Sequence, residues 1–534
     1  GFLQGGGYES EPHGVFFVVS KSFYGFHIRF EEIARGGIRI LHSRTLDQLE
    51  RNGRSLFEEC FSLASTQQKK NKDIPEGGAK GVILLTQLTP AGSEGRENAA
   101  SAFKKYVDAI LDLLLPSEKK SIRFFPKEPE LLFFGPDEGT AELMDWAARR
   151  ARERGYPHWL SFTTGKSAEL GGISHIDYGI TTRGVREYVH ELLRTLKIPE
   201  TSITKVQTGG PDGDLGSNEI LFSKDKTIAV IDGSGVLYDP NGLSRAELRR
   251  LAKKRVTVSH FATRLLGNQG FLVRMEDAKV RLPGGELVAN GEIFRNQFHL
   301  HPMLRADLFV PCGGRPKSVN LSNWEKLLDE KGSPRFRWAV EGANLFFTQE
   351  ARIKLEERGL VLFKDSSTNK GGVTSSSLEV LAALALPDAV FLRHLTSVKN
   401  KIPESRKKFV AEVCEVIVRN ARLEFALLWK EWKERGGRLS LLSDELSERI
   451  ISVTHEMSRT GLADDARLRQ TALKRHIPES LLRLTSLRSL GSKVPERYLA
   501  AVVNRTLAKE FVYRHGLHAG FEDYRGFIEG FRTL

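Results

Sequence analysis

The chain has few cysteines, and this scarcity excludes several classes of protein. Only three occur among 534 residues: Cys60, Cys312 and Cys414. They lie far apart in the sequence, so no two of them have the spacing of a zinc site or of a redox motif. A small scaffold held together by disulfides is therefore excluded, and we expect a reducing compartment, either the mitochondrial matrix or the cytoplasm.

Long apolar runs and a recognisable leader are also lacking. No run of 18 apolar residues occurs, so we expect a soluble protein without a membrane span. The chain starts with Gly1, Phe2 and Leu3 rather than with a methionine, and no signal-peptide pattern follows. We expect a fragment or a processed product whose N-terminal targeting signal is missing.

The composition is that of a large globular protein. Hydrophobic residues make up 40% of the chain and charged residues 28%, and the length suits two or three domains. The net charge of +13 raises the alternative of a nucleic-acid partner. However, the densest basic runs, at 149–154, 253–255 and 406–408, have helical periodicity and are typical of solvated helix faces. We therefore expect no nucleic-acid partner, and a basic surface of this kind would also attract dinucleotides and dicarboxylates.

The sequence divides into three parts. Residues 1–182 mix strand-like and helical stretches, and residues 183–375 alternate short apolar strands with helices. That alternation is typical of a doubly wound parallel sheet. Residues 376–534 are mostly helical, and we expect them to pack back on the first part. The expected fold is therefore a two-domain α/β protein with a Rossmann-type dinucleotide domain and a helical C-terminal extension.

The second part contains an expected insertion. Short strands are predicted at 203–207, 227–232, 306–310, 337–341 and 360–363. Between the second and third of these, an insertion of about residues 244–304 includes a predicted hairpin at 278–288, whose turn is formed by residues 283–285.

A glycine-rich turn follows the first of these strands. It reads TGGPDGDLG at 208–216 and contains Gly210, Gly213 and Gly216. Glycines at such a turn allow a pyrophosphate to approach the backbone and the N-terminus of the next helix. Asp232 ends the second strand, where an acidic residue can accept both ribose hydroxyls of an adenosine and would repel a 2′-phosphate. The pattern predicts NAD binding, and the alternative is a structural turn with a solvated aspartate.

Two residues in the first part are candidates for acid–base chemistry. Lys80 lies in the sequence EGGAKG at 76–81, where glycines leave room for a substrate. Asp137 lies in GPDEGT at 135–140, just before a predicted helix. The alternatives are a solvated lysine in a surface turn and a simple helix cap. Asp137 becomes a catalytic candidate only if Lys80 lies close to it.

Other polar residues occur in loops that follow glycines or predicted strands. Arg35, in ARGGIR, could hold a carboxylate through two hydrogen bonds, or could simply be exposed. Polar loops follow two strands of the second part, at 341–344 and 365–379, where ligands of open parallel sheets bind. His299 and His301 have no third ligand at metal spacing, so no metal site is predicted.

Taken together and in this order, the motifs resemble the glutamate/leucine/phenylalanine/valine dehydrogenase family. The resemblance runs from about residue 30 to 380 and is closest to the large-subunit NAD-dependent glutamate dehydrogenases. The sequences QTGGPDGDLG at 207–216 and LFVPCGG at 308–314 fit that branch, and TGKS at 164–167 with GGIS at 171–174 resembles another family stretch.

The resemblance implies roles for substrate-side residues. Lys80 matches the catalytic lysine, and Asp137 matches the aspartate that transfers protons. Arg35 falls where the glutamate-specific members usually carry a lysine for the side-chain carboxylate of the substrate, and Ser376 matches the serine that shares this carboxylate. Gln68 aligns with the lysine that holds the α-carboxylate, and because it carries no charge, neighbouring Lys69 or Lys70 is an alternative.

The resemblance also implies cofactor contacts and a reaction. Thr181, Asn344 and Asn369 match residues on the cofactor side. The implied activity is NAD-dependent oxidative deamination of L-glutamate to 2-oxoglutarate and ammonia by a homo-oligomer, with substrate in a cleft between the first two parts. Two alternatives are a non-catalytic, dehydrogenase-like subunit of a larger assembly and a dehydrogenase of an apolar amino acid.

Overall fold

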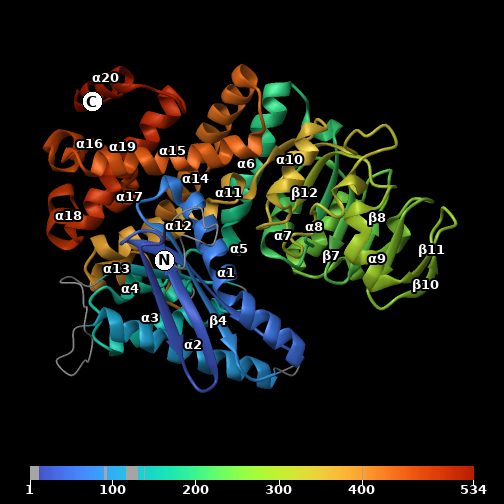
Figure 1. Cartoon of the computed structure of the whole chain (residues 1–534), viewed down its shortest axis with the longest axis horizontal. Helices are drawn as coiled ribbons and strands as arrows, with labels where there is room; N and C mark the ends of the chain where they lie inside the picture. The colour runs from blue at the N-terminus through green and yellow to red at the C-terminus, as the bar shows by residue number, and fades with distance from the viewer. Residues whose placement is uncertain (1–10, 89–92, 116–129, 138, 400, 534) are drawn as a thin grey trace. The chain divides into compact units, whose positions relative to one another are not determined.

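The chain folds into two compact units, each built from segments that are distant in sequence. The computed structural model describes residues 11–88, 93–115, 130–137, 139–399 and 401–533, so the prediction about Gly1 to Leu3 lies outside the described residues. The first unit comprises Gly1–Ser174, Val373–Glu415 and Ser447–Leu534, and the second comprises His175–Gly372 and Val416–Leu446. Each is described here by itself (Figure 1).

The first unit is built around a five-stranded mixed sheet in the order β1-β2-β4-β3-β5. Strand β2 runs antiparallel to both β1 and β4, whereas β3 is parallel to both β4 and β5. The strands are β1 (Gly14–Val19), β2 (Phe23–Arg29), β3 (Ala34–Leu41), β4 (Gly77–Leu85) and β5 (Leu132–Gly135).

Strand β3 was not expected from the sequence, because glycine is disfavoured in strands. The structure explains why glycines occur there. A Cβ atom on Gly36 would lie 1.6 Å from the carbonyl oxygen of Ala79 on β4, so no side chain fits at this position. The glycines therefore allow β3 and β4 to approach closely, which places Arg35 and Lys80 in one sheet.

Helices cover this sheet and fill the C-terminal part of the first unit. Helix α1 packs on β2 and β4 through a core that includes Leu56, Phe61 and Val82. The helices wholly or mainly in this unit are α1 (Leu46–Lys70), α2 (Ser93–Leu114), α3 (Met144–Glu153), α4 (Trp159–Phe162), α12 (Gly371–Ala385), α13 (Asp388–His394), α15 (Leu439–Ser458), α16 (Ala466–His476), α17 (Glu479–Leu482), α18 (Leu487–Lys493), α19 (Glu496–His515) and α20 (Phe521–Arg532).

The second unit contains a seven-stranded sheet in the order β14-β13-β12-β6-β7-β8-β9. Its five parallel strands are those predicted from the sequence, and they confirm the doubly wound fold. They are β6 (Thr204–Thr208), β7 (Lys226–Asp232), β12 (Ala306–Pro311), β13 (Phe336–Val340) and β14 (Val361–Phe363).

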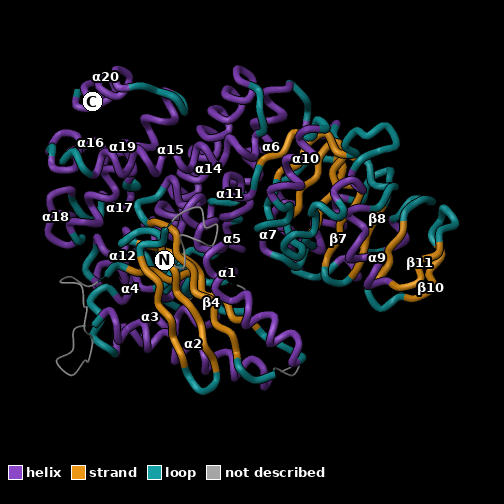
Figure 2. The backbone as a smooth tube through the Cα atoms, in the orientation of Figure 1, coloured by secondary structure: helices purple, strands orange, loops and turns teal. Residues whose placement is uncertain are grey.

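Two antiparallel strands that were not predicted from the sequence extend this sheet. Strands β8 (Gly235–Tyr238) and β9 (Phe271–Arg274) continue it past β7, so part of the expected insertion belongs to the main sheet. The predicted hairpin is present as a separate ribbon of β10 (Ala278–Arg281) and β11 (Leu287–Asn290), shown in Figure 2.

The helices of the second unit include one long helix from the C-terminal part. They are α5 (His175–Tyr178), α6 (Ile180–Leu196), α7 (Asp214–Phe222), α8 (Arg245–Lys254), α9 (Gly291–Gln297), α10 (Gln349–Glu357), α11 (Asp365–Thr368) and most of α14 (Glu404–Arg435). The C-terminal helical region is thus divided between the two units rather than forming one body. In the part of the chain that the structure describes, no helix has the length and apolar character needed to cross a membrane.

Candidate functional site

Lys80 and Asp137 lie side by side in the first unit. Lys80 is on the buried strand β4 and is 8% exposed, and Asp137 follows the end of β5. The ammonium of Lys80 donates a hydrogen bond to Oδ2 of Asp137 and forms an ion pair with it. The structure therefore meets the condition that the sequence set for Asp137 as a catalytic candidate.

The pair meets above a glycine of the intervening strand. A Cβ atom on Gly37 would lie 3.2 Å from Nζ of Lys80 and 3.4 Å from Cβ of Asp137. The loop that carries Asp137 is fixed by Thr140, whose hydroxyl accepts a hydrogen bond from the Asp137 backbone N–H at 2.8 Å. Arg39 adds a second cation, with Nη2 3.6 Å from Oδ1 of Asp137. The carboxylate of Asp137 therefore contacts two basic side chains rather than capping a helix.

Arg35 is buried rather than exposed. Its Nη2 donates to the hydroxyl of Thr164 at 3.1 Å, and its Nε has no hydrogen-bond partner among the described residues. Burial lowers the pKa of Arg35, while the carboxylates of Glu76 and Glu379 act in the opposite direction. A buried guanidinium with a free N–H group is suited to bind an anion.

Ser376 lies in a similar environment on α12. It is fully buried, and its hydroxyl has no hydrogen-bond partner in the described part of the chain. One turn later on the same helix, Glu379 accepts hydrogen bonds from the backbone N–H groups of Ile173, at 2.9 Å, and Gly165, at 3.3 Å. This helix thereby fixes both loops of the stretch at 164–174, which includes the Thr164 partner of Arg35.

The amide of Gln68 is already occupied by protein groups. Its Oε1 accepts from the backbone N–H of Gly78, and its Nε2 donates to Oε1 of Glu31 at 2.9 Å. These contacts join the end of α1 to the start of β4 and do not favour a direct contact with a substrate carboxylate. Lys70, also at the end of α1, is buried, whereas Lys69 lies 3.8 Å from Glu448.

In the second unit, the glycine-rich turn borders a cavity of about 690 Å³. Gly210, Gly213, Gly216 and Asp232 all line it. The first and last of the three glycines have no room for a side chain, because a Cβ atom would lie 2.4 Å from Asp232 or from the Gly210 carbonyl oxygen, respectively. Helix α7 begins at this turn, and an anion could bind to its free N–H groups. Arg295, Arg315, Lys317 and Lys326 bring positive charge to the lining.

Asp232 is more fully hydrogen-bonded than its sequence position indicates. Oδ1 accepts from the N–H and the hydroxyl of Ser234, and Oδ2 accepts from the N–H of Val258 at 2.7 Å. Burial raises the pKa of Asp232, and these donors oppose that effect. Since each carboxylate oxygen can accept two hydrogen bonds, Oδ2 retains one acceptor position. That position suits one ribose hydroxyl rather than the expected two.

The structure joins the two asparagines expected on the cofactor side. Nδ2 of Asn369 donates to Oδ1 of Asn344 and to the carbonyl of Gly342, both at 2.8 Å. Oδ1 of Asn369 is buried and has no hydrogen-bond partner among the described residues. Thr181 lies in the first turn of α6, facing Gly372, whose Cβ would be 3.7 Å from the threonine hydroxyl.

Some residues of the site could not be found by sequence reasoning. Tyr498, on α19, donates to Oε1 of Glu76 at 2.5 Å, and Ser377 donates to Oε2 at 2.7 Å. Glu76 is fully buried and is one of the charges that act on Arg35. No spacing in the sequence indicates this contact, because Tyr498 is 422 residues away.

The histidines singled out in the sequence have other contacts. Burial lowers the pKa of His299 to about 4, and its Nε2 lies 3.4 Å from the Ser318 carbonyl oxygen. His301 lies 3.1 Å from Glu286. Across the described ranges, no group of three or more histidine, cysteine, aspartate or glutamate side chains could hold a metal ion.

Two models of known protein families match the sequence of the chain. The family model for the catalytic domain of bacterial NAD-glutamate dehydrogenase matches residues 8–297, and the glutamate/leucine/phenylalanine/valine dehydrogenase model matches residues 171–436. The first of these models covers more than half of the chain, so the chain belongs to the family of the bacterial NAD-glutamate dehydrogenase catalytic domain.

Curated relatives are similar to the chain in sequence, and a solved structure is similar to it in fold. The chain is 50% identical to glutamate dehydrogenase 2 of Dictyostelium discoideum, over 97% of this chain and 49% of that protein. It is 48% identical to the NAD-specific glutamate dehydrogenase of Neurospora crassa, over 95% and 48%. The chain thus spans about half the length of these relatives. Its fold is similar to that of the hetero-hexameric glutamate dehydrogenase of Thermus thermophilus, with a TM-score of 0.54 and 17% identity over 83% of this chain and 89% of the other.

The glycine-rich turn of this family member allows a matched test. We expect Gly216→Ala to weaken NADH binding by about tenfold or more, because the new Cβ would meet backbone atoms of Gly209 and Gly210 at about 2.5 Å and displace the turn. In Gly213→Ala the nearest atom is 3.7 Å away, so the turn itself should keep its conformation. Fluorescence titration with NADH measures both. Unchanged binding in Gly216→Ala would show that the turn does not form the site.

Proposed function

We propose that this chain is the catalytic part of an NAD-dependent glutamate dehydrogenase, which oxidises L-glutamate to 2-oxoglutarate and ammonia. The observation that carries the proposal is the buried pair of Lys80 and Asp137 beside Gly37. A lysine and a carboxylate that are in contact and keep a small exposed fraction, 10% and 16% of their side chains, supply the acid–base groups that deamination needs. Relatives named NAD-specific glutamate dehydrogenase support the same reaction.

Each member of the pair has a distinct role in the proposed reaction. Bound NAD supplies the acceptor for the hydride that leaves Cα of glutamate. Asp137 takes a proton from the substrate nitrogen and later returns one to the leaving ammonia. Lys80 activates the water that attacks the imine carbon and stabilises the negative charge that develops on its oxygen. The hydrogen bond between Lys80 and Asp137 gives a path for a proton between the two groups.

Arg35 and Ser376 would recognise the side chain of glutamate. Both have a buried polar atom that finds no hydrogen-bond partner among the described residues, namely Nε of Arg35 and Oγ of Ser376. A γ-carboxylate would satisfy both groups, and the desolvated guanidinium makes the interaction strong. Since the amide of Gln68 is engaged with Glu31 and Gly78, the buried Lys70 is the better candidate for the α-carboxylate.

The second unit would hold NAD through the glycine-rich turn. Gly210, Gly213 and Gly216 border the cavity, and the start of α7 offers N–H groups to the pyrophosphate. Oδ2 of Asp232 has an acceptor position for a ribose hydroxyl. Asn344, Asn369 and Thr181 would contact the nicotinamide half, and the unpartnered Oδ1 of Asn369 fits a carboxamide N–H.

We expect Lys80→Ala to lower kcat by about 10²–10⁴-fold, the typical cost of losing a positioned acid–base group. NADH binding should stay nearly unchanged, because Lys80 belongs to the first unit and the glycine-rich turn to the second. Steady-state rates with glutamate and NAD, together with NADH titration, measure both. Lys105→Ala, which removes an exposed lysine of α2, is the control. A wild-type kcat in Lys80→Ala would remove Lys80 from the mechanism.

We expect NAD to be preferred over NADP, because the carboxylate of Asp232 would face the 2′-phosphate as a like charge. Asp232→Ser should reduce the ratio of kcat/KM for NAD to that for NADP by about tenfold or more. Steady-state measurement of kcat/KM with NAD and with NADP, in the unmodified chain and in Asp232→Ser, tests this preference. Equal kcat/KM values for the two cofactors in the unmodified chain would contradict the role given to Asp232.

We expect glutamate to be preferred over leucine by roughly 10⁴-fold in kcat/KM, because a leucine side chain offers no hydrogen-bond acceptor to the buried Nε of Arg35, which has none among the described residues. Arg35→Leu should collapse this ratio mainly by harming glutamate, whereas Arg35→Lys, which keeps the charge, should retain part of it. The alternative that Arg35 pairs permanently with Glu31 or Glu32 is not favoured. Glu31 bonds to Gln68 and His455, and Glu32 pairs with Arg497. An unchanged ratio in Arg35→Leu would exclude Arg35 from substrate selection.

A further inference from the structure

Two loops of the second unit begin at buried carboxylates. Glu341 directly follows β13 and starts the loop that carries Asn344, and Asp365 follows β14 and starts the segment that carries Asn369. Both carboxylates are completely buried. Burial of two anions so close together is costly unless a cation and hydrogen bonds compensate them.

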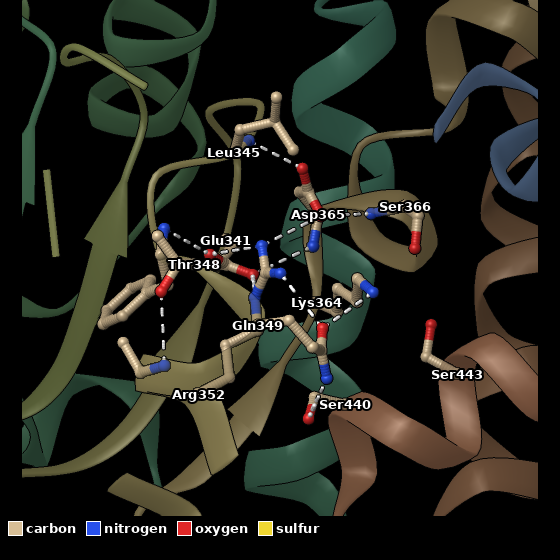
Figure 3. A network of polar contacts seen from close by, with 12 residues as sticks. Glu341, Leu345, Thr348, Gln349, Arg352, Lys364, Asp365, Ser366, Ser440 and Ser443 are labelled. Atoms are coloured by element: carbon tan, nitrogen blue, oxygen red, sulfur yellow. Dashed lines mark hydrogen bonds and ion pairs between the residues drawn. The ribbon is translucent and has the colours of Figure 1, made fainter. Parts of the chain in front are cut away.

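Arg352, on α10, supplies that cation. It is 2% exposed, and its guanidinium lies between the two carboxylates (Figure 3). Nε donates to Oε2 of Glu341 at 2.9 Å, and Nη2 donates to Oε1 of Glu341 at 3.2 Å and to Oδ1 of Asp365 at 3.3 Å. One planar side chain therefore fixes both acids at once, which a lysine could not do with the same geometry.

The two carboxylates in turn hold the backbone of both loops. Oε1 of Glu341 accepts from the N–H of Phe347, and Oε2 accepts from the N–H of Asp365, both at 3.2 Å. Oδ2 of Asp365 accepts from the N–H of Leu345 at 2.8 Å. Leu345 has a φ of 56°, a left-handed conformation that is unfavourable for leucine and needs such support. It directly follows Asn344, so this hydrogen bond fixes the asparagine as well.

The pKa of Glu341 depends on the charges of Arg352 and Asp365 beside it. Burial raises the pKa of Glu341 to about 7, the nearby Arg352 opposes that rise, and Asp365 adds to it. Arg352 therefore counteracts the effect of burial, and its loss would raise the pKa of Glu341 further. Lys364, beside Asp365, pairs instead with Asp444 of α15, so it does not replace Arg352.

We propose that Arg352 is a positioning residue for cofactor binding, which sets the loops of Asn344 and Asn369 by holding Glu341 and Asp365. This inference rests on the proposed function, because it takes the two asparagines to face NAD. Arg352 touches neither substrate nor cofactor. It acts through two buried acids, and the hydrogen bond between Asn369 and Asn344 joins the loops that it fixes. A buried ionic network of this kind contributes more to one defined arrangement than to stability.

The test compares the unmodified chain with Arg352→Lys, Arg352→Met and a control, Arg438→Met. Arg438, just before α15, pairs with Glu357 at the end of α10, and both side chains are partly exposed. We expect Arg352→Lys to raise KM for NAD about tenfold and to weaken NADH binding equally, while KM for glutamate stays within about twofold. Arg352→Met should be more severe, and Arg438→Met should change neither constant. If Arg352→Met does not fold, Arg352→Lys decides alone.

A merely structural role would lower the melting temperature and the active fraction while leaving KM for NAD unchanged, and this outcome would overturn the proposal. Hydrogen–deuterium exchange at the amides of Leu345 and Phe347 gives a second readout that does not depend on activity. Their exchange should be faster in Arg352→Lys than in Arg438→Met, and equal exchange would also overturn the proposal. If the unmodified chain binds no NADH, the proposed function fails, and the exchange rates still show whether Arg352 orders the loops.

Discussion

The arrangement of the first unit depends on how closely β3 approaches β4. Lys80 belongs to β4 and Asp137 follows β5, so β3 lies between them and the two strands are roughly 10 Å apart. Their side chains meet only because Gly37 presents no Cβ at the crossing point, and Gly36 lets the two backbones come together. The same strand carries Arg35 at its start. One pair of glycines thus brings the acid–base pair and the candidate anion site into a single sheet.

In the first unit, glycines position the candidate residues because they have no side chains. In the second unit, buried charged side chains hold the loops. Its glycine-rich turn needs space at Gly210 and Gly216, but the loops after β13 and β14 are held by Glu341, Arg352 and Asp365. A buried polar group is costly unless it is hydrogen-bonded, and few arrangements satisfy all groups of the network at once. The network therefore stabilises one conformation of the loops. The free Oδ1 of Asn369 and the free acceptor position of Asp232 then remain available within an otherwise satisfied framework.

Much of the second unit could be predicted from sequence, because short apolar runs between turns are a local signal. Strands β6, β7, β12, β13 and β14 and the β10–β11 ribbon were found in this way. Strand β3 was not predicted, because its glycines have low strand propensity. Strands β8 and β9 were not predicted either, because their pairing depends on the tertiary structure. Candidate residues such as Lys80 and Asp137 were named from their neighbours in the chain, whereas Thr164 and Tyr498 were not, because their partners Arg35 and Glu76 are distant in sequence.

The sequence by itself determined the family, the doubly wound second unit and the residue types of the site, since each is written in runs of a few residues. Only the tertiary structure decided which of those residues meet. In the folded chain Lys80 contacts Asp137. The amide of Gln68 is hydrogen-bonded to Glu31 and Gly78, and most acceptor positions of the Asp232 carboxylate are filled by protein donors. The physical reason is that a side chain's hydrogen-bond partners depend on burial and on strand order. Both are fixed by packing over the whole chain rather than by its nearest neighbours.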